Sequence, residues 1–435
     1  MRDTYDVVIA GGGPAGATAG LILAREGFSV CILEKDRHPR LHIGESILPR
    51  NMRVIQELGL EPALRRLPHV PKYGAEFGMG NDPATRSFLF SDGLVPGMPV
   101  FNIERAHFDR MLLDEARAAG AEVHEEAPVR RVLGLSRDGA HVATDGGEVR
   151  ARLLLDASGQ GTLLGRALNL RRNFDEPELQ KVAYYQHFEG VERPAGLATG
   201  HPCIIMCEEG WFWLIGLTGT KTSVGFVTRP SFVRTLDIPP KRLLSWAVAR
   251  CPVVRHRMRD ARGVIDNVIL SDFSYRCRPY AGDGYFLVGD AACFLDPIFS
   301  TGVTLAMLSA QHTAGLASAL LRGSVSHAAA QRRHIRFVEE STAPFWRLIR
   351  GYYRHSFREL FMQGQGPFQM QRAIISILAG QVFPRPPWAL RWRHHAFDAC
   401  VQLQTIVPLV PRRTPCRLVE QEPVAVAGIG SPAEA

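Results

Sequence analysis

Short apolar runs alternate with longer stretches of helical period at the start of this chain. Residues 6–10 form one apolar run, residues 14–27 have a helical pattern, and residues 29–33 form a second apolar run. Short apolar runs separated by a helix are typical of buried strands in a parallel sheet. The first 36 residues therefore predict a strand–helix–strand unit.

The same patterns predict further elements along the chain, because apolar residues near a period of about 3.6 indicate helices and alternation indicates strands. The expected elements are a helix at 50–58, a strand at 101–105 followed by a helix at 108–119, strands at 121–124 and 129–133, a hairpin around 145–147, a buried strand at 152–159, antiparallel strands over 180–270, a buried strand at 285–290 and a helix at 301–321. Residues 335–410 are predicted to be helical, with breaks at 364–367 and 384–387.

The turn between the first strand and helix contains the motif G-x-G-x-x-G, formed by Gly11, Gly13 and Gly16. Gly11 allows a tight turn, Gly13 lets the backbone approach a pyrophosphate, and Gly16 lets helix and strand pack closely. The free N–H groups of the helix N-terminus then face the phosphates. Glu34 ends the second strand, where it can accept a hydrogen bond from a ribose hydroxyl. The motif predicts a dinucleotide site but does not choose between FAD and NAD.

These elements predict an α/β fold with a discontinuous Rossmann-like domain, since 435 residues are too many for one simple core. That domain is expected to comprise residues 1–75, 100–165 and 270–335. A mostly antiparallel β domain is expected at 76–99 and 166–269, a helical region at 336–415, and a disordered tail at 416–435.

Composition and charge narrow the choice of partner. Hydrophobic residues make up 46% of the chain, as in ordinary globular proteins, and the formal net charge is +8. No nucleic-acid-binding module is legible, so the late arginines predict either an acidic partner or a solvated face. Their spacing of three to four residues predicts a single helix face made of Arg347, Arg350, Arg354 and Arg358.

The cysteines predict neither disulfides nor a metal site. The eight cysteines are scattered, and the one close pair, Cys203 and Cys207, lies in a strand-like run and is interpreted as core. The chain has no signal-peptide pattern and no apolar run of about 18 residues, so no transmembrane segment is expected. A cytoplasmic protein fits these features.

The block from residue 287 to residue 303 favours FAD over NAD. A strand ends at Gly289 and Asp290, where the acid can bond a ribityl hydroxyl, and Pro297 then turns the chain. Gly302 begins a helix whose N–H groups can face the flavin or an anion. A second glycine-rich stretch, 159–165, departs from a nicotinamide fingerprint because its third glycine comes one residue late.

With Arg105 and the segment from Asp156 to Gly159, this block resembles the FAD-dependent oxygenases of the p-hydroxybenzoate hydroxylase type over about residues 1–330. The resemblance implies FAD as cofactor and a substrate domain formed by the inserted sheet. The cofactor-binding residues that it implies are Gly11, Gly13, Pro14, Ala15, Gly16, Glu34, Lys35, Ser46, Arg105, Asp156, Gly159, Gly289, Asp290, Pro297, Gly302 and Val303.

Within this family the chain is most similar to the flavin-dependent halogenases. The matching stretches are 39–49, with its G-E-S-x-x-P pattern, the segment around Lys72 at 71–77, the Trp211-x-Trp213 motif at 210–215, and 296–303. There are two departures. Gly216 stands where the motif has proline, and Phe299 stands where the tryptophan halogenases have glutamate. The second departure points to the branch that acts on phenols or on carrier-tethered pyrroles and phenols.

The resemblance implies a reaction of reduced FAD with oxygen to a C4a-hydroperoxide, from which chloride or bromide takes an oxygen to give hypohalous acid. Ser300, Thr301 and Gly302 would hold the halide, and Glu45 is a candidate for the same side of the flavin. Trp211 and Trp213 share one face of a strand and would keep organic substrate from the oxidant. Lys72 would direct the hypohalous acid onto an electron-rich ring, by hydrogen bond or as a chloramine.

The implied partners are a separate flavin reductase and an aromatic substrate that is either free or bound to an acyl or peptidyl carrier protein. Two alternatives of the same fold stay open: an aromatic hydroxylase that oxidises NAD(P)H itself, and a flavin reductase of the geranylgeranyl type. More ordinary interpretations also remain, with the tryptophans as core residues, Lys72 as a surface lysine and Glu45 as a capping acid. The aromatic run at 345–361 is either core or the wall of a substrate tunnel.

Overall fold

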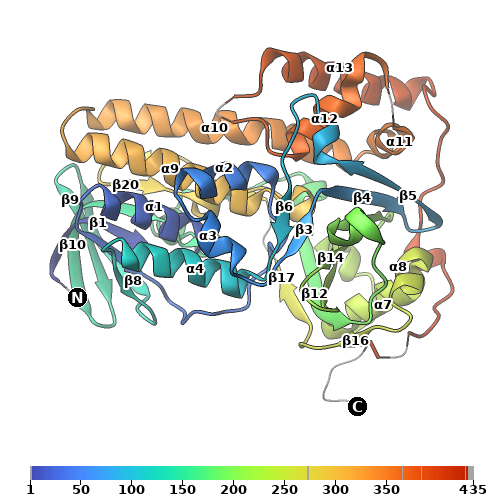
Figure 1. Cartoon of the computed structure of the whole chain (residues 1–435), viewed down its shortest axis with the longest axis horizontal. Coiled ribbons are helices and arrows are strands. Elements are labelled where there is room, and N and C mark those ends of the chain that lie inside the picture. The colour runs from blue at the N-terminus through green and yellow to red at the C-terminus, as the bar shows by residue number, and fades with distance from the viewer. Residues whose placement is uncertain (1, 272–273, 365, 384, 427, 430–435) are drawn as a thin grey trace. The chain divides into compact units, whose positions relative to one another are not determined.

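The computed structural model describes residues 2–271, 274–364, 366–383, 385–426 and 428–429 (Figure 1). The chain forms two compact units that alternate along the sequence. The first unit comprises Met1–Pro68, Glu104–Asn173 and Ser274–Ala343, and the second comprises His69–Ile103, Phe174–Phe273 and Pro344–Ala435.

The first unit is built on a mostly parallel sheet with the strand order β19-β20-β10-β1-β2-β7, in which only the edge pair β19–β20 of this order is antiparallel. Ile9 in the centre pairs with Ile32 on one side and Leu155 on the other, and all three are buried. Continuous apolar runs suit such strands because both faces of a parallel sheet are covered. The strands are β1 (Thr4–Ala10), β2 (Val30–Leu33), β7 (Glu122–His124), β10 (Gly147–Asp156), β19 (Ala281–Gly282) and β20 (Tyr285–Leu287), and the hairpin strands β8 (Val129–Ser136) and β9 (Gly139–Thr144) extend the sheet from β10.

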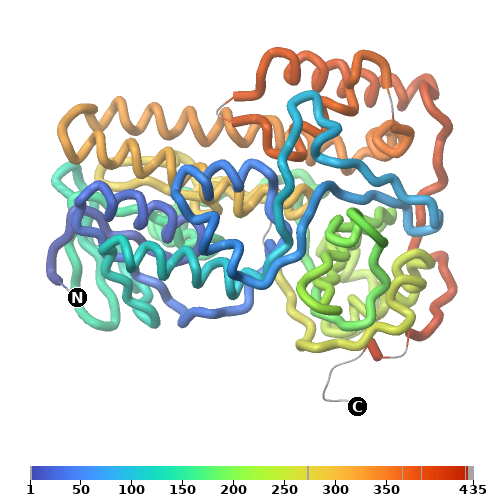
Figure 2. Tube along the Cα trace, in the orientation of Figure 1, coloured from blue at the N-terminus to red at the C-terminus, as the bar shows by residue number. Residues whose placement is uncertain are grey.

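Helices cover this sheet, and α1 (Pro14–Arg25) packs against both α4 (Arg105–Ala118) and α9 (Gly302–Leu321). A Cβ on Gly20 of α1 would lie 2.6 Å from Ile32 Cδ1, so the helix lies directly on the sheet at this point. Figure 2 follows the chain through α9 and the start of α10 (His327–Tyr352), which run side by side; His312 stacks on Phe337 between them. The other elements of this unit are α2 (Pro49–Glu57), α3 (Glu61–Arg65), α5 (Leu163–Ala167) and the small sheet β11 (Arg171–Asn173), β18 (Tyr275–Cys277) and β21 (Cys293–Phe294).

The second unit contains a largely antiparallel sheet with the order β16-β12-β15-β14-β13-β4-β5. One face of the sheet forms an apolar core in which the ring centroids of Phe212 and Phe226 lie 4.6 Å apart, and helix residues Leu244 and Val248 join the same cluster. The strands are β4 (Gly74–Met79), β5 (Asp82–Leu89), β12 (Val182–Glu189), β13 (Cys203–Met206), β14 (Gly210–Gly216), β15 (Thr222–Thr228), β16 (Arg262–Gly263) and β17 (Val268–Leu270), with β3 (Val70–Lys72) and β6 (Val100–Asn102) paired separately.

Residues 230–257, expected to continue the antiparallel strands, instead form helices α6 (Pro230–Val233), α7 (Leu243–Arg250) and α8 (Pro252–Arg257). The expectation was wrong here because an apolar run of eight residues or fewer fits either structure by periodicity alone. The helices cover the core face of the sheet, where Val254 and Met258 are buried.

The expected helical region is confirmed by the end of α10, α11 (His355–Gln363), α12 (Met370–Leu378) and α13 (Trp388–Ile406). Residues 365 and 384, within the two expected breaks, lie outside the described residues. Within the described chain, no helix combines the length and the apolar composition needed to cross a membrane.

The expected single face of four arginines is wrong. Helix α10 ends at Tyr352, so Arg354 becomes the N-cap of α11 and Arg358 lies beyond the break. Arg358 is buried and donates to the carbonyl oxygens of Tyr352 and Cys207. The guanidinium of Arg350 donates hydrogen bonds to the two carboxylate oxygens of Glu176, at 2.8 and 2.9 Å. The four arginines have helical spacing in the sequence, but the helix ends at Tyr352, before the last two of them.

The start of the expected disordered tail is also folded. Cys416 and Leu418 are fully buried in the apolar core of the second unit, and the short helix η9 (Leu418–Glu420) follows. The carboxylate of Glu209 accepts hydrogen bonds from the N–H groups of Leu418 and Val419 at 2.9 and 3.3 Å. A few apolar residues are therefore sufficient to pack this largely polar segment against the core of the second unit. Residues 427 and 430–435 lie outside the described residues.

Candidate active site

The glycine motif forms a tight turn between β1 and α1. Gly11 has φ +109°, and a Cβ there would lie 2.4 Å from the carbonyl oxygen of Ala157. A Cβ on Gly16 would lie 1.9 Å from the carbonyl oxygen of Gly11, so both positions require glycine. Gly13 differs, because the nearest atom to its Cβ position is Arg40 Nη2 at 3.5 Å. The space in front of Gly13, at the start of α1, is therefore open to a phosphate group.

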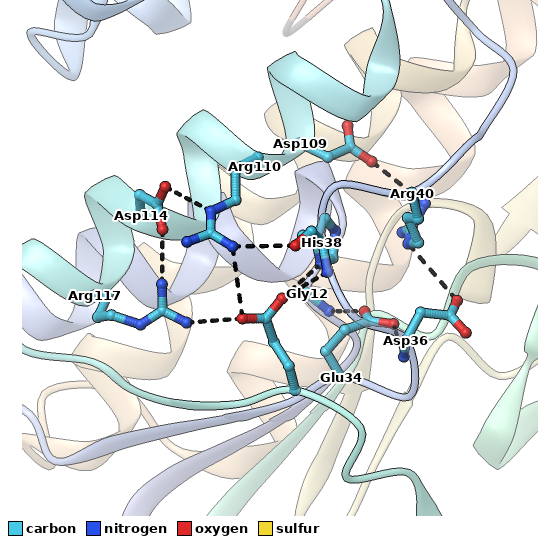
Figure 3. A network of polar contacts seen from close by, with 10 residues as sticks. Gly12, Glu34, Asp36, His38, Arg40, Asp109, Arg110, Asp114 and Arg117 are labelled. Carbon is cyan, nitrogen blue, oxygen red and sulfur yellow. Dashed lines mark hydrogen bonds and ion pairs between the residues drawn. The ribbon is translucent and has the colours of Figure 1, made fainter.

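Glu34 is part of a polar network beside this turn (Figure 3). Its buried carboxylate accepts hydrogen bonds from Gly12 N at 2.6 Å and from Asp36 N at 2.9 Å. Each carboxylate oxygen has two lone pairs, so the same group can still accept a ribose hydroxyl. Glu34 thus holds the turn in shape. Lys35 is exposed and lies 3.8 Å from Asp36.

Asp109, which contacts Arg40 in the same network (Figure 3), also pairs with Arg105. Arg105 donates to both carboxylate oxygens of Asp109, at 2.7 and 2.9 Å, and to the carbonyl oxygen of Ile43 at 2.7 Å. Burial alone would raise the pKa of Asp109, but the neighbouring Arg105 guanidinium outweighs burial and lowers this pKa. The sequence motifs pointed to Arg105 but not to Asp109, which lies one helical turn later on α4.

Asp156 is the last residue of β10 and is fully buried rather than at an open surface. Its buried carboxylate accepts from Ser158 N at 3.0 Å, Ser158 Oγ at 2.5 Å and Leu164 N at 2.7 Å. Burial raises the pKa of Asp156. These contacts shape the loop at Gly159, which has φ +60° and no atom within 4 Å of its Cβ position among the described residues.

Asp290 follows β20 on the short turn Gly289–Ala291. Burial raises its pKa to about 7, although the positive charge of Arg105 acts to lower it. The turn is held by Gly289 N, which donates to Ser309 Oγ at 2.9 Å, and by Asp290 O, which accepts from Tyr275 at 2.8 Å. A carboxyl group that is shielded from water needs a hydrogen-bond partner, and a hydroxyl group can supply one.

The loop from Pro297 to Thr301 leads into the 20-residue helix α9. Asp296 caps the turn through Ile298 N at 3.0 Å, and Ser300 adopts the left-handed conformation at φ +54°. In the described structure the Thr301 side chain makes no capping bond, and nothing lies within 4 Å of a Cβ on Gly302. The first N–H groups of α9 are therefore available to an anion.

The residues of the first unit fit FAD. Open space lies before Gly13, Gly159 and Gly302, where an extended anionic dinucleotide needs close backbone approach. Among the residues that the structure describes, the buried Oγ of Ser46 has no hydrogen-bond partner. Its neighbour Glu45 is also buried, and its charge acts on Arg105. Pro14 and Ala15 are buried in the first turn of α1, and Val303 in that of α9.

In the second unit, Lys72 ends β3 opposite Val100 of β6. Its side chain is only 1% exposed, and its Nζ lies 5.1 Å from the ring centroid of Phe90. Burial lowers the pKa of Lys72 from 10.5 to about 7. The interpretation of Lys72 as an ordinary surface lysine is therefore wrong. Near neutral pH its amine can be either neutral or charged.

Close backbone contacts hold the Lys72 segment in place. A Cβ on Gly200 would lie 1.9 Å from the carbonyl oxygen of Pro71. The buried amide of Asn102 donates to the carbonyl oxygens of Gly200 at 2.8 Å and Gly216 at 3.1 Å. Asn102, on β6, thus connects the paired strands β3 and β6 to the end of β14, the strand that carries the two tryptophans. A buried asparagine that bonds two backbone carbonyls fixes the relative position of the segments that carry them.

His201 follows Gly200, which lies against Pro71 of β3. Burial lowers the pKa of His201, opposed by Glu76 and reinforced by Lys72. Its Nδ1 is 2.9 Å from Ser87 Oγ, and Glu76 is paired with Arg257 at 2.6 Å. Sequence reasoning did not select Asn102 or His201, because nothing in their local pattern distinguishes them from other isolated polar residues.

Trp211 and Trp213 lie on the face of the sheet opposite the apolar core, with ring centroids 6.0 Å apart. Trp213 lies over Gly225 of β15, where a Cβ would come within 2.3 Å of its indole, and Tyr185 pairs with Gly225 from the other side. The Trp211 indole N–H donates to the Tyr353 hydroxyl at 3.1 Å, and Lys181 Nζ lies 3.9 Å from the Tyr353 ring centroid. The expected shared face is confirmed.

Gly216 departs from the motif for a structural reason. A Cβ on Gly216 would lie 3.1 Å from Arg193 Nε and 3.2 Å from its Cδ. Arg193 also donates to Thr222 Oγ1 at 3.0 Å and to the carbonyl oxygens of Gly219 and Lys221. The Arg193 side chain thus occupies the space that a proline ring would need, and it closes the turn after β14.

The aromatic run at 345–361 is mostly core. Phe345, Ile349, Tyr352, Phe357 and Phe361 are all buried, and Phe357 stacks on Phe361. Tyr353, which is half-buried, is the member that contacts a predicted site residue, Trp211.

Comparison with known proteins identifies the class first. A profile of the FAD binding domain family matches residues 4–187, which include the glycine turn and most of the parallel strands of the first unit. The chain is 32% identical over 344 residues to the 1H-pyrrole-2-carbonyl-[peptidyl-carrier protein] chlorinase of Pseudomonas fluorescens, covering 72% of this chain and 75% of that relative. It is 33% identical over 313 residues to the corresponding brominase of Pseudoalteromonas luteoviolacea, covering 70% and 75%.

Solved structures agree with these relatives. The flavin-dependent brominase Bmp2 superposes with a TM-score of 0.81 at 28% identity, covering 92% of this chain and 100% of that chain. The myxobacterial chondrochloren halogenase CndH gives 0.76 at 27% identity, with coverages of 92% and 98%. The chain belongs to the flavin-dependent halogenases, as its motifs predicted. It is an enzyme of the FAD-dependent class, with halide as the family's second reactant.

The open space at Gly13 separates cofactor binding from folding. We expect Gly13→Val to lose FAD while its unfolding midpoint stays close to that of the wild-type apoprotein, because a side chain there meets only Arg40. Gly11→Ala is the matched control, and it should be strongly destabilised by its positive φ and its contact with Ala157. Flavin absorbance and thermal unfolding measure the two effects, and a fully loaded yellow Gly13→Val variant would contradict this assignment.

The burial of Lys72 predicts a pH-dependent stability difference. Between pH 7 and 10.5 the unfolded chain holds a proton on this lysine that the folded chain has lost, so wild-type stability gains about 1.4 kcal/mol per pH unit there. Lys72→Met lacks this gain. The variant should therefore be more stable than wild type at pH 7 and below, with the gap closing toward pH 10.5. Urea unfolding at several pH values tests this, and a gap that does not change with pH would contradict it.

Proposed function

We propose that this enzyme halogenates an electron-rich aromatic ring, a phenol or a pyrrole, by directing hypohalous acid with Lys72. The observation that carries the proposal is the buried amine of Lys72, with its pKa lowered to about 7. A surface lysine would be charged and hydrated at neutral pH, whereas this amine is available in both protonation states.

The neutral amine supports one route and the ammonium ion the other. A neutral amine can take the halogen of hypohalous acid, forming an N–halogen bond and releasing water. The ring then receives the halogen and the amine recovers its proton. The ammonium form can instead donate a hydrogen bond to the oxygen of hypohalous acid, which makes the halogen more electrophilic. Both routes convert Ar–H and hypohalous acid into Ar–halogen and water.

The first unit would hold the cofactor that makes this oxidant. Bound reduced FAD, supplied by a separate flavin reductase, provides with oxygen the oxidising power that converts chloride or bromide into hypohalous acid. In this proposal the turn at Gly11–Gly16 binds the pyrophosphate, and Glu34 and Asp290 accept hydroxyl groups. The backbone N–H groups after Ser300 hold the halide at the start of α9.

Trp211 and Trp213 would restrict access to the oxidant. Both indoles are buried, and each indole N–H donates a hydrogen bond: that of Trp211 to the Tyr353 hydroxyl, and that of Trp213 to Ser223 Oγ at 3.2 Å. Two large side chains held in this way exclude a bulky organic molecule from the space that they fill. They would thereby favour transfer of a small oxidant over direct oxygenation of the substrate, which distinguishes a halogenase from a hydroxylase of the same fold.

The substrate class is proposed from the relatives and from Phe299. Two relatives act on a pyrrole tethered to a peptidyl carrier protein, by their names. Phe299, buried at the start of the α9 loop, replaces the glutamate of the tryptophan halogenases. The arginine face expected to bind an acidic carrier does not form, so charge no longer favours a tethered substrate over a free one.

Removing the amine should abolish ring halogenation and spare the flavin reaction. We expect Lys72→Met to lower product formation roughly 100-fold or more, with FAD binding and oxygen consumption retained. Lys72→Arg, which keeps a charge but cannot become a neutral amine, separates the two routes: it should retain activity only if a hydrogen bond suffices. Lys241→Met, at an exposed lysine, is the control.

The assay combines the enzyme, a flavin reductase, bromide and a panel of phenols and pyrroles, free and carrier-bound, with products read by mass spectrometry. Loss of FAD together with product in Lys72→Met would show a structural role for the lysine. Rapid NADPH oxidation by the enzyme without reductase would favour the hydroxylase instead.

A further inference from the structure

Three buried cysteines from distant parts of the sequence meet at one point in the second unit. Cys207 follows β13, Cys251 lies between α7 and α8, and Cys416 comes from the segment after α13. Their sulfur atoms all lie within 4.8 Å of one another, and the sulfurs of Cys207 and Cys251 are 3.9 Å apart. The proposed halogenation assigns no role to these three thiols.

Gly80 shows that the sulfurs converge on one small space. A Cβ on Gly80 would lie 2.8 Å from the sulfur of Cys416 and 2.9 Å from those of Cys207 and Cys251. The backbone of Gly80 is not in the left-handed region, so its conformation does not require glycine. The absence of a side chain at Gly80 instead leaves room between the three sulfurs.

Backbone hydrogen bonds fix the four segments around this space. Gly80 N donates to Met206 O at 2.9 Å, Val253 N donates to Gly80 O at 3.2 Å, and Glu208 N donates to Cys416 O at 2.8 Å. The buried guanidinium of Arg358 donates to Cys207 O at 3.1 Å, which brings a positive charge near the thiols. The sulfurs therefore belong to a rigid arrangement with a cation beside it.

This geometry matches a thiophilic metal ion. Zinc–sulfur bonds are about 2.3 Å long, so two sulfurs on one ion lie about 3.8–4.0 Å apart, close to the Cys207–Cys251 distance. Thiolate donors select the soft ions Cu(I) and Zn(II) over hard cations. Three sulfurs complete a trigonal site for Cu(I), whereas Zn(II) needs a fourth ligand such as water.

We propose that Cys207, Cys251 and Cys416 bind one thiophilic d10 cation in a trigonal sulfur site. The ion joins the segment that carries Cys416 to the sheet and to the turn between α7 and α8. Binding replaces the three thiol protons by one metal ion, so up to three protons leave and the affinity rises with pH. The site has a structural role, and the proposal is independent of the halogenation chemistry.

The test uses the full-length, FAD-loaded protein, produced in medium supplemented with either zinc or copper and purified under a reductant. Metal content is measured by plasma mass spectrometry, and the metal–sulfur distances by X-ray absorption. We expect one equivalent of metal with three sulfur neighbours at about 2.3 Å. The supplement that loads the protein distinguishes Zn(II) from Cu(I). Removing the ion should lower the unfolding midpoint.

Cys251→Ala should lose the metal, whereas Cys203→Ala should keep it, because Cys203 is buried in the same apolar core but is not one of the three. Gly80→Ala provides a second route: it retains all the thiols but places a methyl group among the sulfurs, so it should also lose the metal. Equal metal content in Cys203→Ala and Gly80→Ala would overturn the proposal. So would a metal-free wild-type protein, or a disulfide between Cys207 and Cys251.

Discussion

Burying the amine of a lysine is costly, because a charged ammonium ion loses its hydration when it leaves water. Lys72 meets that cost by lowering its pKa to about 7, and the surrounding structure makes the burial possible. Gly200 lies against the Pro71 carbonyl, Asn102 connects the paired strands β3 and β6 to β14, and the ring of Phe90 lies beneath the amine. Together these contacts keep the amine in place and out of water. A group with a perturbed pKa in a rigid apolar setting is a candidate for catalysis, and here it coincides with the halogenase motif.

The flavin-binding unit depends on a different constraint, which is close backbone approach. Its turn needs glycine at Gly11 and Gly16 because carbonyl oxygens occupy the Cβ positions, whereas the space at Gly13 is open and the fold itself does not require glycine there. The carboxylate of Glu34 holds the same turn through Gly12. Folding and cofactor binding therefore place separate demands on neighbouring glycines of one motif.

Much of this could be predicted from local sequence. The strand–glycine–helix unit, the hairpin around residues 145–147 and the shared face of Trp211 and Trp213 follow from periodicity and glycine placement, and all are confirmed. The predictions that were wrong depended on contacts between distant residues or on patterns that fit more than one structure. Short apolar runs at 243–254 were expected as strands but are helices, and four arginines at helical spacing straddle a helix end. Cys416 and Leu418 dock into the core, although their segment is polar. The meeting of Cys207, Cys251 and Cys416 is visible only once the chain has folded.

The proposed chemistry requires that Lys72 is buried and that its amine changes protonation near neutral pH. Its pKa can be measured directly by NMR, by following the side-chain Cε resonance of 13C-labelled lysine with pH and assigning the signal by its loss in Lys72→Arg. We expect one lysine to titrate with a midpoint near pH 7, well separated from the others near 10.5. A Lys72 signal that titrates with the surface lysines would contradict this expectation.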